Sequence, residues 1–75
     1  MRFIEMSGAQ LMSALTDNDA TPEELKAAGL TDNCLVRINI HGDIEVRRPH
    51  GWDVIGGLIG EFEPRVKKAA GRDWA

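Results

Sequence analysis

The sequence predicts a small α+β domain in which an antiparallel sheet packs against helices, and three observations support this class. Two helix-start signals lie in the first third of the chain. Two runs rich in β-branched residues, in which apolar and polar residues alternate, follow at 34–40 and 44–48. From Trp52 onward the apolar residues recur at the spacing of a helix. The expected element order over residues 1–75, taken as one domain, is therefore β-α-α-β-β-α.

The chain is expected to begin with a short strand and a short helix. Residues 2–6 alternate in a way that is compatible with a brief strand. Ser7 and Gln10 then fit a capping box, in which each side chain satisfies a backbone amide of the other residue. The polar residues at 16–20 are rich in turn formers, so the helix is expected to stop there.

The signal for a second short helix is the strongest local signal in the chain. Thr21 precedes Pro22, and proline at the first helical position loses no hydrogen bond. Gly29 can adopt the left-handed conformation that ends many helices, and Leu30 could pack back on the last turn. A helix of about two turns is expected here.

The two β-branched runs predict a hairpin. A three-residue loop at His41–Asp43 would pair Ile40 with Ile44 and Ile38 with Val46. The apolar face would then consist of Val36, Ile38, Ile40, Ile44 and Val46. The other face would carry Leu35, Arg37, Asn39, Glu45 and Arg47, and we expect solvent or a partner to cover it.

The last third of the chain is expected to form a longer helix. Its apolar residues recur at helical spacing, at Trp52, Ile55, Ile59, Phe62, Val66 and Ala69. Three glycines and Pro64 lower helix stability, so a kink or break is expected between Gly60 and Pro64. Gly71 is the expected C-cap. Gly56 and Gly60 lie four residues apart, a spacing that lets a helix approach either a partner or the rest of its own fold closely.

The composition limits what can stabilise so short a chain. Cys34 is the only cysteine, which rules out an intramolecular disulfide. No two of Cys34, His41 and His50 have zinc-site spacing, so neither a metal nor another cofactor is expected. Because a chain of this length buries only roughly two thirds of its unfolded surface, we expect a homodimer to supply additional stability.

No signal peptide and no apolar segment long enough to cross a membrane is visible, so a cytoplasmic location is expected. The polar side of the last third is mixed in sign, which does not favour a membrane surface as partner. The formal net charge of -3 does not favour a general nucleic-acid coat.

The sequence is compatible with three functions. A non-catalytic protein-interaction or regulatory module is the preferred one, with contacts at Arg37, Arg47, Trp52, Gly56, Gly60 and Trp74. A nucleic-acid-binding module that uses the arginines of the 34–48 hairpin is the alternative. A small enzyme that uses Cys34 with His50 as base is the third, and it rests only on residue type.

Overall fold

The computed structural model describes residues 2–16 and 19–75. Within these ranges it contains seven elements: β1 (Phe3–Ser7), α1 (Gly8–Ala14), α2 (Pro22–Ala27), β2 (Leu35–Asn39), β3 (Asp43–Arg48), β4 (Gly51–Gly57) and α3 (Phe62–Ala70). The strands form one antiparallel sheet in the order β1-β2-β3-β4. The predicted α+β class is confirmed, with one strand more than expected.

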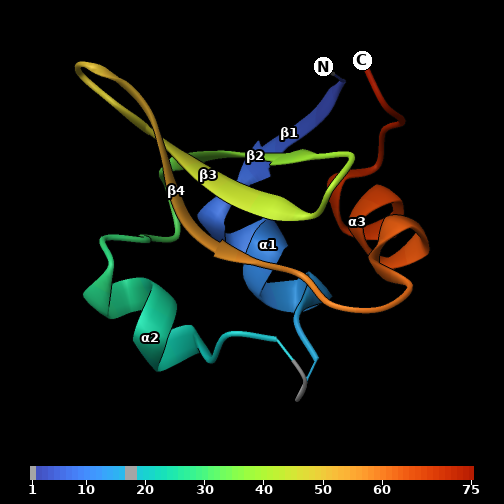
Figure 1. Ribbon diagram of the computed structural model, residues 1–75, viewed down its shortest axis with the longest axis horizontal. Helices are drawn as coiled ribbons and strands as arrows, with labels where there is room; N and C mark the ends of the chain where they lie inside the picture. The colour runs from blue at the N-terminus through green and yellow to red at the C-terminus, as the bar shows by residue number, and fades with distance from the viewer. Residues whose placement is uncertain (1, 17–18) are drawn as a thin grey trace.

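The helices lie around one face of the sheet. In Figure 1, α1 lies behind the sheet with α2 and α3 to either side, and the β3–β4 hairpin extends beyond the rest of the molecule. Alternate strand residues point to this inner face and are buried, namely Ile4, Met6, Val36, Ile38, Ile44 and Val46. They pack with apolar residues of the helices and loops: Leu11, Leu25, Leu30, Leu58, Val66 and Ala70.

The predicted helix signals of the first third are confirmed. The Ser7 hydroxyl accepts from the Gln10 amide at 3.1 Å, and the Gln10 side chain accepts from the Ser7 amide at 2.8 Å. The Thr21 hydroxyl accepts from the Glu24 amide at 3.2 Å and so caps α2, and the chain leaves that helix through Gly29 with a φ of 106°. Of the turn expected at 16–20, residues 17 and 18 lie outside the described residues.

The hairpin at β2 and β3 is confirmed, but its predicted register is wrong by two residues. Ile38 pairs with Ile44 and Val36 with Val46, so the loop is formed by 40–42 and Ile40 is exposed. Asn39 sets this register, because its side-chain oxygen accepts from the amides of His41 and Asp43 at 2.9 and 3.1 Å. Gly42, with a φ of 87°, supplies the left-handed residue that completes a three-residue loop.

The prediction that the last third is helical from Trp52 is wrong. Residues 51–57 form β4, which pairs with β3 through a two-residue turn at 49–50. The apolar residues of this segment fit both periods over so short a span, and the hydrogen bonds offered by β3 favour the strand. Residues 52–60 contain no helix, so the expected kink or break within a helix does not occur; α3 begins at Phe62 and contains Pro64 in its first turn. The predicted C-cap is confirmed, because Gly71 ends α3 in the left-handed region.

Candidate interaction surface

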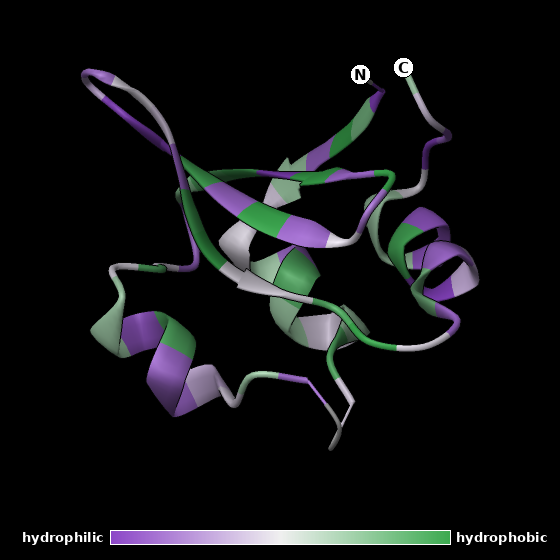
Figure 2. Ribbon diagram, viewed as in Figure 1, coloured by the Kyte–Doolittle hydropathy of each residue, from purple (hydrophilic) through white to green (hydrophobic). Residues whose placement is uncertain are grey.

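The outer face of the sheet is defined by the strand residues that alternate with the core residues. They are Phe3, Glu5, Leu35, Arg37, Asn39, Asp43, Glu45, Arg47, Trp52 and Val54. Figure 2 shows the alternation along β3, where hydrophilic and hydrophobic residues succeed one another. The apolar residues of the helices pack into the core on the inner face. The outer face is therefore covered only by the side chains of its own strands.

A stack of three side chains lies across the outer face. The Arg37 guanidinium lies 3.8 Å from the centroid of the Phe3 ring and 4.2 Å from that of the Trp52 ring. Phe3 comes from β1 and Trp52 from β4, so the aromatic side chains reach Arg37 on β2 from both edges of the sheet. Each cation–π contact of this kind contributes on the order of 1 kcal/mol. We call this group the Phe3–Arg37–Trp52 stack.

The stack encloses a carboxylate. Arg37 donates to Glu45 on the adjacent strand, with an N–O distance of 3.0 Å, and Glu45 is only 8% exposed although it lies on the outer face. Sequence reasoning proposed Arg37 and Trp52, and the fold brings these two together. It placed Glu45 on this face without giving it a role, and it missed Phe3, which reaches the face through the pairing of β1 with β2.

Exposed apolar side chains flank the stack. Leu35 is 45% exposed and Val54 is 63% exposed, and both belong to the outer face. Arg47 is exposed beside them, with its guanidinium 5.8 Å from the Trp52 ring. The outer face therefore combines aromatic, arginine and aliphatic surface, and the first two of these are enriched at protein interfaces.

The neighbouring Arg48 is engaged within the fold. It donates to Asp53 at 3.2 Å and to the carbonyl oxygen of Ala28 at 2.8 Å, which ties the β3–β4 hairpin to the end of α2. Hydrogen bonds from His50 and then from Arg48 lower the pKa of Asp53. Asp53 is therefore ionised at neutral pH.

Trp74 lies apart from the stack. It is half-buried against the core. Hydrogen bonds from the side chains of Lys67 and then Trp74 lower the pKa of Glu63. The chain around it is held to β1, because Phe3 and Ala75 exchange two backbone hydrogen bonds. Trp74 thus anchors the segment after α3 within the monomer.

Gly56 and Gly60 do not share a helix face, because Gly56 lies in β4 and Gly60 in the loop before α3. A side chain at Gly56 would lie 3.2 Å from Leu25 of α2, so this glycine gives α2 room inside the monomer. Gly60 has a φ of 74° and open space around it, so backbone conformation explains its identity.

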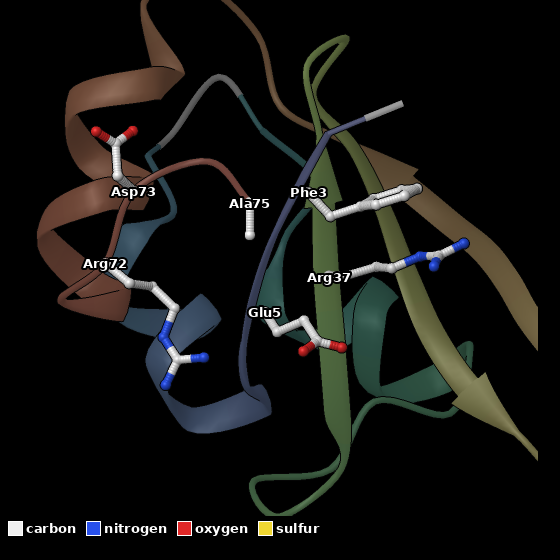
Figure 3. A pocket seen from close by; sticks show the side chains of 6 residues that line it. All are labelled: Phe3, Glu5, Arg37, Arg72, Asp73 and Ala75. Atoms are coloured by element: carbon white, nitrogen blue, oxygen red, sulfur yellow. The ribbon is translucent and has the colours of Figure 1, made fainter.

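A pocket of about 230 Å³ lies between β1 and the segment after α3. Figure 3 shows Arg72 directed toward β1, while Phe3 and Arg37 extend side by side in another direction. The charged residues that line this pocket are Glu5, Arg37, Arg72 and Asp73. Because two acidic and two basic side chains line the pocket, its charge favours neither an anion nor a cation.

A second polar cluster, missed in the sequence, joins the loops on the inner side. The side chain of Asp19 is fully buried and accepts from the Thr16 amide, the Ile59 amide and Arg65 at 2.8–2.9 Å. Arg65 also donates to the carbonyl oxygens of Ala14 and Ile59. Burial raises the pKa of Asp19, but hydrogen bonds from Ile59, Arg65 and Thr16 outweigh it and lower the pKa from 3.8 to about 2.

The groups that could support catalysis or metal binding are dispersed. Cys34 is half-buried beside α1, whereas His50 contacts Asp53 on the exposed β3–β4 hairpin at 3.3 Å. Within residues 2–16 and 19–75, no three histidine, cysteine or acidic side chains cluster as metal ligands. Over the same ranges, no helix is long and apolar enough to cross a membrane.

Comparison of the chain with protein-family models, curated proteins and solved structures gives no match.

Proposed function

We propose that this chain is a non-catalytic protein-interaction module that docks its partner on the outer face of the sheet. The observation that carries the proposal is the Phe3–Arg37–Trp52 stack with exposed Leu35 and Val54 beside it. Tryptophan and arginine are the residues that most often dominate binding energy at interfaces. Contacts within the stack hold both side chains before binding, which reduces the entropy that binding would cost.

The partner we propose first is a second copy of the chain, packed outer face to outer face. A two-fold axis parallel to the strands would set β1 of one copy over β4 of the other, and β2 over β3. Because such an axis keeps each residue at its level along the strands, Val54 of one copy would lie over Glu5 of the other, and Leu35 over Arg47. The exposed side chains of Leu35 and Val54 would then be covered by the second copy.

Light scattering over a concentration series tests this proposal. We expect a dimer that persists at raised salt, because apolar contacts are not screened. Leu35→Lys should shift the mass toward monomer, since it introduces a charge into the interface. Ile59→Lys is the matched control, because Ile59 is 62% exposed but belongs to the loop before α3. A monomer at every concentration, or equal masses for both variants, would contradict self-association through this face.

Nucleic-acid binding by the 34–48 hairpin receives less support. Two of its three arginines have partners within the chain, since Arg37 binds Glu45 and Arg48 binds Asp53. Three carboxylates, those of Glu5, Asp43 and Glu45, share the outer face and would repel phosphates. Titration with a single-stranded oligonucleotide at low salt should therefore show no binding.

A further inference from the structure

The segment after α3 folds back along the edge of the sheet. Gly71 ends α3 with a φ of 71°, and the chain then runs beside β1 as residues 72–75, which we call the 72–75 strap. Within the strap, Ala75 accepts from the Phe3 amide at 3.1 Å and donates to the Phe3 carbonyl oxygen at 2.9 Å. Figure 3 shows Ala75 beside β1, from which Phe3 extends alongside Arg37. The strap therefore borders the part of the outer face that carries the stack.

The strap supplies the backbone hydrogen bonds of Phe3. In an antiparallel ladder, the N–H and C=O groups of one residue point to the same side of its strand. Those of Phe3 point to Ala75, so Phe3 and Asn39 of β2 form a non-bonded pair of the ladder. Because β1 begins at Phe3, the ladder holds this residue from one end only. The position of Phe3 therefore depends on Ala75.

The strap itself is held by the core and by α3. The Trp74 side chain packs half-buried against the core, and the Trp74 carbonyl oxygen accepts from Arg2 at 3.1 Å. Asp73 forms an ion pair of 3.0 Å with Lys67 of α3. Hydrogen bonds from Lys67 and then from the Trp74 amide lower the pKa of Asp73, so this ion pair is present at neutral pH. These contacts fix the strap, and the strap fixes Phe3.

Phe3 in turn orders Arg37. The Phe3 ring lies 3.8 Å from the guanidinium, closer than the Trp52 ring at 4.2 Å. Without the Phe3 ring, the long Arg37 side chain would have more rotamers available on that side. An arginine that becomes ordered only on binding adds an entropy cost to binding. The order of the outer face therefore depends on a segment that lies beside it.

We propose that the 72–75 strap prepares the outer face for docking by holding Phe3 against Arg37, and that release of the strap weakens docking of the second copy. The statement about docking rests on the proposed function, whereas the link from strap to stack does not. The strap acts as a positioning segment through Phe3, so it needs no contact with the partner.

Ala75→Pro tests the strap, because it removes the N–H that donates to the Phe3 carbonyl oxygen. Ala75→Ser keeps this N–H and is the matched control. NMR of the diluted, monomeric chain follows two signals. In Ala75→Pro the Phe3 amide should exchange about tenfold or more faster than in the wild type. The side-chain protons of Arg37 should shift toward their random-coil positions, because they leave the neighbourhood of the Phe3 ring. Ala75→Ser should match the wild type in both signals.

Light scattering of the same variants measures the effect on docking. The dissociation constant of the dimer should rise about tenfold in Ala75→Pro and should change less than about twofold in Ala75→Ser. Phe3→Ala should raise it by a similar factor, and the two changes together should add little, because both act through the same ring.

Three results would overturn the inference: an unchanged Phe3 amide in Ala75→Pro, faster exchange of that amide with unchanged Arg37 signals, or a wild-type dissociation constant in Ala75→Pro. A wild type that is monomeric at every concentration would contradict self-association, and with it the statement about docking. In that case the Arg37 signals still decide whether the strap holds the stack, so the two failures are distinguishable.

Discussion

The two faces of the sheet are stabilised in different ways. The inner face carries six fully or nearly fully buried aliphatic and methionine side chains from β1–β3, and helices cover it. The outer face has no such layer, and an arginine between two aromatic rings covers it instead. Apolar burial contributes in proportion to area, whereas a half-exposed stack contributes a few contacts of modest strength. The fold should therefore depend on the inner face, and binding should depend on the outer one.

The largest effect is expected in the inner core. Ile38→Ala should reduce the free energy of unfolding by about 4 kcal/mol, because it opens a cavity at a fully buried position. Ile40→Ala is the matched control and should cost less than about 1 kcal/mol, since Ile40 is exposed in the β2–β3 loop. Urea denaturation measures both changes. Similar losses for the two variants would contradict the register found here.

An intermediate effect is expected at the buried ion pair on the inner side. Asp19→Asn should cost about 2 kcal/mol at neutral pH, since Arg65 loses its counter-ion. Because the pKa of Asp19 is lower in the folded chain than its ordinary value of 3.8, its contribution is present above about pH 4 and is lost as the pH falls through about 2. Denaturation at several pH values should show the gap between wild type and variant closing with acid. A gap that is constant with pH would contradict a native ionised Asp19.

The smallest effect is expected in the outer-face stack. Arg37→Lys keeps the charge near Glu45 but loses the planar guanidinium that lies between the rings of Phe3 and Trp52. It should reduce the free energy of unfolding by about 1 kcal/mol while leaving the core intact. A double-mutant cycle with Trp52→Ala measures the coupling, and a coupling near zero would show that the stack is not an energetic unit.

The elements that sequence reasoning identified correctly are those specified by local chemistry. The capping residues Ser7 and Thr21 and the C-cap Gly71 fix the ends of helices through contacts within a few residues. The prediction failed at 51–57, where a segment with helical spacing found a strand partner in β3. It was also wrong in the hairpin register, which depends on the Asn39 side chain and Gly42 rather than on pairing the most apolar residues.

The candidate surface could be predicted only in part. Residue type alone indicates Arg37, Arg47 and Trp52 as contact residues, and the fold places them on one face. Phe3 is distant from them in sequence, and its role follows only from the pairing of β1 with β2. Asp19 and Arg65 were missed for the same reason, since 46 residues separate two side chains whose charged atoms lie 2.9 Å apart.

The sequence by itself determined the α+β class, the helix starts and the alternation that assigns each residue of the β2–β3 hairpin to one of two faces. These follow from side-chain periodicity and from hydrogen bonds made over three or four residues. Only the tertiary structure decided that Gly51–Gly57 is a strand and that Phe3 and Trp52 meet across Arg37. Those outcomes depend on which distant segments supply hydrogen bonds and burial, and no local pattern contains that information.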